Sequence, residues 1–343
     1  MRPPIGNGAC NLCPAYMVRT LLNNKELSVA PMMAWTDRHC RYLHRLVSSR
    51  AMLFTEMITS GALLNGPAER LLRFDPSEHP VAIQLGGSEP SAMAEAARMA
   101  AAAGFDEINI NVGCPSPRVQ RGAFGACLMR EPELVAALVD AMHAATEIPV
   151  TVKCRLGVDD DDSQEQLESF VTTVASAGCR RFYVHARKAL LNGLSPAENR
   201  TVPPLEYERV YALKARHPEL TIVINGGIDD ADEALAHLAR VDGLMIGRRA
   251  YQAPLFLNML AHRLYDEPLL DACEVMGVYT DYMARELKSG TRLADMTRHC
   301  LGLFAGMPGA RHFRRLLSDH RRLKRNDLSL VKEAMDQLER SAA

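Results

Sequence analysis

Short apolar runs and longer amphipathic stretches alternate along most of the chain. The short runs are rich in β-branched residues, and the segments between them repeat apolar residues every three or four positions. The short runs predict eight strands, at Leu27–Ala30, Met52–Thr55, Val81–Leu85, Glu107–Ile110, Val150–Cys154, Arg181–Val184, Thr221–Ile224 and Gly243–Ile246. The intervening periodicity predicts helices, among them Ser91–Ala103, Pro132–Ala145 and Asp232–Ala239.

Eight strand–helix units within about 230 residues predict a closed (β/α)8 barrel. The competing arrangement is an open doubly wound sheet. That fold commonly carries G-x-G-x-x-G in its first strand-to-helix turn, and the chain has no such pattern. The expected fold class is therefore α/β, with a TIM barrel as its main part.

The strand pattern stops after Pro254, and helical periodicity continues to the end of the chain. The predicted helices form a small all-α bundle and span Ala272–Leu287, Arg292–Leu303, Ala310–Leu323 and Leu330–Leu338. Residues 265–268 interrupt the pattern, which places a boundary between Leu260 and Pro268. We predict a loose leader at residues 1–24, a barrel at 25–262 and a helical domain at 268–343.

The overall charge of the chain hides an uneven distribution. The formal net charge of the 343 residues is −1, with 40 basic and 41 acidic side chains. Residues 285–325 hold eleven Lys or Arg against three acids, a net +8, which leaves −9 on the remainder. The net charge of the whole chain disfavours a polyanionic partner. The basic segment, considered by itself, is compatible with one.

The cysteines and the aspartate run do not indicate a metal site or a disulfide framework. Nine scattered cysteines and no secretory signal indicate a reducing, cytoplasmic setting. Cys10 and Cys13 have no second pair at the spacing of a zinc site. The run Asp159–Asp162 reads as a solvated loop before an N-capped helix rather than a magnesium site. No apolar run is long enough for a membrane span.

Polar and glycine residues gather where the predicted strands end, and barrel enzymes carry their chemistry in the loops after the strands. Asn225-Gly226-Gly227 and Gly247-Arg248 follow the last two strands, where the fold commonly binds phosphate through backbone N–H groups and a forked cation. Tight turns alone would also explain these glycines. Lys153 and His185 end the fifth and sixth strands, and a fixed cation such as Lys153 would suit the anionic ring of a reduced flavin.

Cys114 lies in a Gly-Cys-Pro loop directly after the fourth strand. Most free cysteines are buried small hydrophobes, but this loop does not bury Cys114 as a strand residue. With an ordinary pKa of about 8.5 the side chain is mainly a thiol at neutral pH. A thiol at the catalytic face of a barrel indicates a proton donor.

These residues together resemble one enzyme family. The segment 108–115, Ile-Asn-Ile-Asn-Val-Gly-Cys-Pro, with Val119 and Gly125-Ala126, closely resembles the signature of the tRNA-dihydrouridine synthases. The resemblance covers residues 25 to 340, and residues 187–200 resemble the branch acting at D-loop positions 20 and 20a. The family's flavin site matches positions that we expect to bind FMN: Pro31, Met32, Met33, Ala34, Gln84, Lys153, His185, Asn225, Gly226, Gly227, Gly247 and Arg248.

The resemblance also implies the reaction. NADPH would reduce FMN, the flavin would pass hydride to C6 of a tRNA uridine, and Cys114 would protonate C5. The implied tRNA contacts are Asn111, Arg200, Arg311 and Arg314. A helical projection of residues 311–325 predicts one cationic face suited to RNA, although a solvated face stays the alternative.

Two other functions stay open. A flavin barrel acting on a free pyrimidine, as dihydroorotate dehydrogenases do, explains the flavin site but not the basic helices. A non-catalytic RNA-binding protein explains the basic helices but gives Cys114 and Lys153 no purpose.

Overall fold

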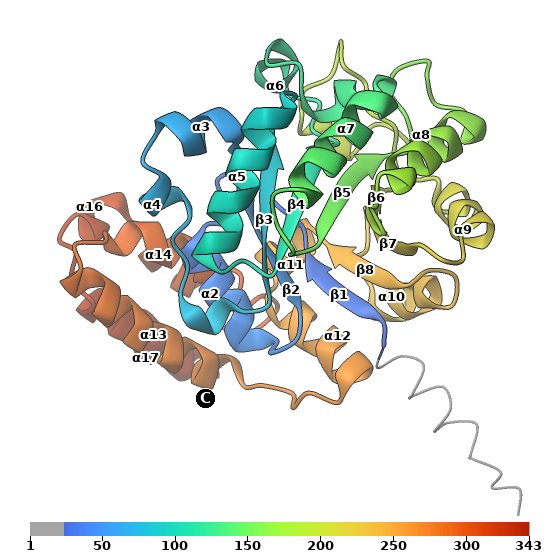
Figure 1. Ribbon diagram of the computed structural model, residues 1–343. Coiled ribbons are helices and arrows are strands. Elements are labelled where there is room, and N and C mark those ends of the chain that lie inside the picture. The colour runs from blue at the N-terminus through green and yellow to red at the C-terminus, as the bar shows by residue number, and fades with distance from the viewer. Residues whose placement is uncertain (1–23, 343) are drawn as a thin grey trace, which may run out of the picture.

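The computed structural model describes residues 24–342, and its centre is a closed barrel of eight parallel strands (Figure 1). Each strand pairs with the next along the chain, and the last pairs with the first. The strands are β1 (Glu26–Val29), β2 (Met52–Thr59), β3 (Val81–Gly86), β4 (Glu107–Val112), β5 (Val150–Arg155), β6 (Arg181–His185), β7 (Thr221–Asn225) and β8 (Gly243–Ile246). All eight predicted strands are confirmed, and β2 continues four residues beyond its predicted end.

Helices surround the barrel on its outer face (Figure 1). The larger ones are α2 (Arg38–Val47), α5 (Pro90–Ala103), α7 (Pro132–His143), α8 (Gln164–Ser176), α9 (Tyr207–Arg216), α10 (Ala231–Leu238) and α12 (Leu255–Tyr265). Short turns of helix lie between them at α3 (Ser60–Asn65), α4 (Ala68–Leu71), η1 (Pro76–Glu78), α6 (Pro117–Arg121), η2 (Gly125–Arg130), η3 (Glu198–Arg200) and α11 (Arg248–Gln252). Most strand residues are buried, which explains why apolar residues dominate the strands, although β4 alternates them with buried Glu107, Asn109 and Asn111.

Capping residues mark the ends of these helices. Helix α5 ends at Gly104, whose φ of 93° is the left-handed conformation that glycine adopts without strain. Helix α8 begins at Ser163, whose hydroxyl accepts from the backbone of Gln166 in a capping box. The aspartates before it lie in a loop, and Arg130 pairs with Asp159 and Asp161. The interpretation of this run as a loop before an N-capped helix is confirmed.

The chain after the barrel is helical and lies beside α2 (Figure 1). Its helices are α13 (Ala272–Lys288), α14 (Leu293–Cys300), α15 (Ala310–Leu317), α16 (His320–Leu323) and α17 (Ser329–Ala342). The prediction of one helix over Ala310–Leu323 is wrong, because the helix ends at Leu317. Asp319 then accepts hydrogen bonds from the backbone N–H groups of Arg321 and Arg322 and begins a new helix.

Charged and aromatic side chains join α2 to these helices. Arg38 forms an ion pair with Glu286, and His39 Nδ1 lies 2.7 Å from the hydroxyl of Tyr282. One continuous apolar cluster runs from the outer layer of the barrel into the helical segment. The boundary between two domains near residues 262–268 therefore stays a prediction.

Two further observations concern only residues 24–342. None of these helices is long and apolar enough to cross a membrane. No group of three His, Cys, Asp or Glu side chains in this part of the chain is arranged to hold a metal ion. The predicted leader and the pair Cys10 and Cys13 lie outside the described residues, apart from position 24.

Candidate active site

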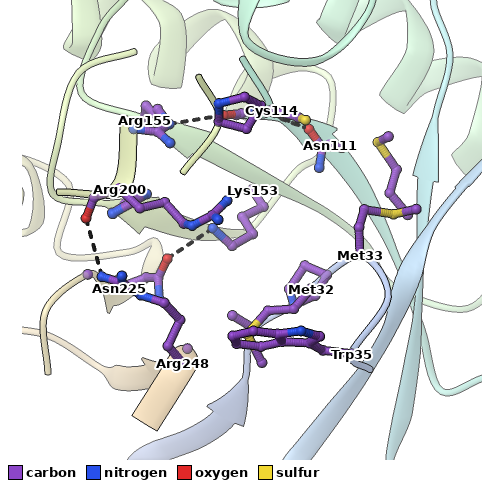
Figure 2. A pocket seen from close by; sticks show the side chains of 18 of the residues that line it. Met32, Met33, Trp35, Asn111, Cys114, Lys153, Arg155, Arg200, Asn225 and Arg248 are labelled. Carbon is purple, nitrogen blue, oxygen red and sulfur yellow. Dashed lines mark hydrogen bonds between the residues drawn. The ribbon is translucent and has the colours of Figure 1, made fainter. Parts of the chain in front are cut away.

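A cavity of about 470 Å³ opens at the carboxyl ends of the strands (Figure 2). This volume is within the usual range of small-molecule sites. The structure brings most of the predicted site residues together in its wall: Pro31, Met32, Met33, Gln84, Asn111, Cys114, Lys153, His185, Arg200, Asn225, Gly226, Gly227, Gly247 and Arg248. The side chains come from the strand ends and the loops after them, as the barrel fold requires.

Three predicted residues are not in this wall. Ala34 follows the lining residue Met33, but its φ of 62° turns the chain and its N–H donates to Glu56. Arg311 and Arg314 are exposed on α15, which contributes nothing to the cavity. A role for these two arginines must therefore concern a surface beyond the cavity.

The loop that carries Cys114 is fixed by the end of β4. The side-chain oxygen of Asn111 accepts hydrogen bonds from the backbone N–H groups of Gly113, at 3.2 Å, and Cys114, at 3.0 Å. The Asn111 amide in turn donates to Gln84 at 2.8 Å. On the other side, the Cys114 carbonyl accepts from the backbone N–H of Ala126. Asn111 therefore holds the cysteine loop in place.

Burial keeps the Cys114 side chain protonated. The thiol is half-buried in the cavity wall, and desolvation raises its pKa above the ordinary value. The nearby Arg155 and Lys153 oppose this effect more weakly. Because the neutral thiol dominates at physiological pH, Cys114 is in the correct state to donate a proton.

Lys153 is a cation without an anion. Its ammonium donates to the side-chain oxygen of Asn225 at 3.1 Å, and it forms no ion pair with any carboxylate of residues 24–342. Burial, reinforced by the charge of Arg155, lowers the pKa of Lys153 to about 8. A buried ammonium in this state favours an anionic ligand, which would supply the missing charge.

His185 is neutral in this environment. Burial lowers its pKa well below the ordinary value, and the charges of Arg155 and Lys153 add to the effect. Its ring has no hydrogen-bond partner within the described residues and lies in the cavity wall. The imidazole nitrogens are therefore available to form hydrogen bonds with a ligand.

The turn after β7 depends on glycine. Gly226 has a φ of 116°, and a Cβ placed on it would lie 2.6 Å from the ring of His185. The hydroxyl of Tyr207 donates to the Gly226 carbonyl at 2.8 Å and fixes the turn. After β8, a Cβ on Gly247 would meet no atom within 4 Å, so the backbone there borders open space. The turn after β8 therefore leaves room for a ligand to approach the backbone closely, whereas glycine at 226 is required by the His185 ring packed against it.

Arg155 is a site residue that the sequence did not identify. It ends β5, and its guanidinium donates to the carbonyls of Gly113, Lys188 and Asn199 at 2.9–3.0 Å. One buried side chain thus ties the Cys114 loop to the segment that carries Arg200. Its position beside Lys153 in the sequence was the available signal, but the three carbonyl partners are distant in the chain.

Comparison with known proteins identifies the family of this chain. The family model described as dihydrouridine synthase (Dus) matches residues 28–340. The chain belongs to the dihydrouridine synthase family. A protein from Vibrio cholerae named tRNA-dihydrouridine(20/20a) synthase is 51% identical over 313 residues, which are 90% of this chain and 95% of that protein.

Other relatives in the dihydrouridine synthase family carry the same name. The Escherichia coli K12 protein named tRNA-dihydrouridine(20/20a) synthase is 52% identical over 90% of both chains. The Xanthomonas campestris protein of that name is 52% identical over 93% of this chain and 96% of its own length. The resemblance seen in residues 108–126 is therefore confirmed at the level of the family, and these matches cover both the barrel and the helices.

Proposed function

We propose that this chain reduces uridine to 5,6-dihydrouridine in the D-loop of tRNA, at positions 20 and 20a, with FMN as cofactor and NADPH as reductant. The proposal rests on the family and on the activity for which its relatives are named. The observation that carries it is the protonated Cys114 thiol in the same cavity as the unpaired Lys153. Because the substrate is tRNA, we place the reaction in the cytoplasm.

The cavity fits a flavin nucleotide in three respects. Its wall combines a buried ammonium without a carboxylate, glycine turns after β7 and β8, and the exposed guanidinium of Arg248. Asn225, Gly226, Gly227, Gly247 and Arg248 would hold the phosphate end. We assign the ring end to Lys153, Gln84 and His185, and its apolar border to Pro31, Met32 and Met33, which line the cavity whereas Ala34 does not.

Gln84 keeps part of its capacity for such a ligand. Its side-chain amide donates to Asn109 at 2.8 Å and its oxygen accepts from Asn111 at 2.8 Å. Each end of the amide group can form one further hydrogen bond. This network fixes the orientation of Gln84 before any ligand enters.

The chemistry then divides between cofactor and protein. A bound, reduced FMN supplies the hydride for C6 of the uracil ring. Cys114 donates its proton to C5, and Asn111 and Arg155 keep the loop in position for that transfer. Lys153 provides a fixed positive charge beside the ring. The thiolate left on Cys114 regains a proton from solvent.

The substrate must reach this cavity as an unstacked base. We propose that the helical segment 268–343 binds the tRNA backbone and that Arg200, at the cavity, approaches the target nucleotide. Arg311 and Arg314 are exposed and form no ion pair within the part of the chain described. Arg322, which also lies within residues 311–325, is paired with Glu333, so we do not assign it to RNA.

The proposed function is tested with the purified protein. We expect bound flavin in the absorbance spectrum, slow NADPH oxidation alone, and dihydrouridine formation when unmodified tRNA is added. A flavin-free protein that binds tRNA would indicate a non-catalytic role. Reduction of free uracil or a related pyrimidine, with no product in tRNA, would favour the small-molecule alternative.

A further inference from the structure

The single tryptophan of the chain, Trp35, lies in the wall of the cavity. It belongs to the loop between β1 and α2 and stacks on Tyr251 of α11, with ring centroids 4.3 Å apart and an interplanar angle of 13°. In Figure 2, Trp35 and Cys114 lie on opposite sides of the site, with Lys153 between them. No part of the proposed chemistry uses this aromatic pair.

The stack is supported at the backbone of the Trp35 loop and at the Tyr251 side chain. The loop before α2 closes as a tight turn in which the Thr36 hydroxyl accepts from the backbone N–H of Met32 at 2.9 Å. The Tyr251 hydroxyl donates to the Arg298 carbonyl at 3.2 Å, and His299 packs edge-on against the Tyr251 ring. Trp35 is therefore presented in one orientation without a further loss of side-chain entropy on binding.

The surroundings of Trp35 favour a nucleic-acid ligand. Met33, which precedes it by two residues, is 61% exposed, an unusual value for a large apolar side chain beside a cavity. Arg248 and Arg249 also border the cavity, are exposed, and form no ion pair with residues 24–342. The nearest acid on this loop, Asp37, is already occupied by Arg298 and His299.

Aromatic faces and unpaired arginines together are the chemistry that binds single-stranded RNA. We propose that Trp35 is a stacking platform for the base next to the target uridine in the same strand. Arg249 would lie near the phosphates that flank this base, while Arg248 stays assigned to the phosphate end of the cofactor. This inference rests on the proposed function and adds a specificity-determining contact to it, because a stacked neighbour fixes which nucleotide enters the cavity.

The test combines two proteins with two RNAs. The holoenzyme and its Trp35→Leu variant, which keeps apolar bulk but has no ring, are assayed on an unmodified tRNA transcript. They are also assayed on the same transcript lacking the base beside the target. For the wild type we expect kcat/KM to fall by about five- to 150-fold on the abasic transcript, the range for one lost base stack.

On the intact transcript, kcat/KM of Trp35→Leu should be lower than that of the wild type by the same factor. On the abasic transcript, kcat/KM of Trp35→Leu should fall no further. Trp35→Phe retains a smaller ring, so its kcat/KM should still fall in part when the neighbouring base is removed. This variant serves as the control if Trp35→Leu folds poorly. Trp35 fluorescence gives a second readout, since it is the only tryptophan. Intact RNA should quench it more strongly than abasic RNA.

Two results would overturn the platform. If kcat/KM of Trp35→Leu falls on the abasic transcript as much as that of the wild type, the ring does not touch that base. Loss of bound flavin in this variant would show that the ring serves the cofactor instead. A wild type that forms no dihydrouridine in the intact transcript would refute the proposed function itself, which is a separate outcome.

Discussion

The pH dependence of FMN binding should report directly on Lys153. In the free protein, burial and Arg155 lower the pKa of this ammonium to about 8. The anionic ring of reduced FMN, bound beside Lys153, should return the pKa toward the ordinary value of about 10.4. Between pH 7 and pH 9 the free side chain loses its proton while the bound one keeps it, so the apparent Kd should rise about tenfold, or about 1.4 kcal/mol.

The sign of this effect is fixed by the direction of the pKa shift. Affinity is full below pH 8 and falls as pH rises through the free-state pKa. The phosphate of FMN, with a second pKa of about 6, keeps its charge over this interval. The assay is an anaerobic titration of flavin-stripped protein with reduced FMN, followed by the quenching of Trp35 fluorescence at pH 7, 8 and 9.

Matched variants separate Lys153 from its neighbours. Lys153→Arg stays charged to pH 9 and should bind FMN with little dependence on pH. Lys153→Met should bind more weakly at pH 7 and also show a flat profile. Cys114→Ala should retain the tenfold change. A wild-type affinity that is constant from pH 7 to pH 9 would refute the assignment of an anionic ligand to Lys153.

Three further predictions concern other parts of the chain. Cys114→Ala should keep its flavin and oxidise NADPH but form dihydrouridine about 10² to 10⁴ times more slowly, the usual contribution of a general acid. The double change Arg311→Gln and Arg314→Gln should weaken tRNA binding and lower the salt slope by about one per lost phosphate contact. Arg41→Met leaves the buried carboxylate of Glu78 unpaired and should cost about 3–5 kcal/mol in urea unfolding.

Controls from the same chain sharpen these tests. Cys127→Ala, on η2 and also half-buried, should leave product formation intact. Arg322→Gln should leave the salt slope unchanged, since this guanidinium pairs with Glu333. Full product yield from Cys114→Ala would exclude it as the acid. An unchanged slope in the Arg311 and Arg314 variant would remove α15 from the RNA surface, and a stability loss below about 1 kcal/mol would contradict the Arg41 argument.

The barrel was predictable because its strands carry a strong and local signal. The strands are largely buried, so apolar β-branched residues dominate segments such as Ile222–Ile224 of β7. The polar residues at the strand ends were also predictable as a group, since all parallel strands finish at one rim. This rule brought Cys114, Lys153 and Asn225 into one cavity without any knowledge of their contacts.

Other features depend on contacts between distant positions, which one sequence does not reveal. Arg155 holds carbonyls 33 to 44 residues away, and Trp35 stacks on a tyrosine contributed by the last strand–helix unit. The helical projection of residues 311–325 failed for a different reason. It assumed one continuous helix, whereas α15 ends at Leu317 and Asp319 acts as the N-cap of a second helix.

The most direct test of the central claim is a map of dihydrouridine in tRNA. Unmodified tRNA transcripts bearing uridine at positions 20 and 20a are incubated with the purified protein and NADPH, and reduced uridines are located at nucleotide resolution. We expect dihydrouridine at these D-loop positions and at no other uridine. An intact flavoprotein that oxidises NADPH and leaves every uridine of the transcript unreduced would contradict the proposed function.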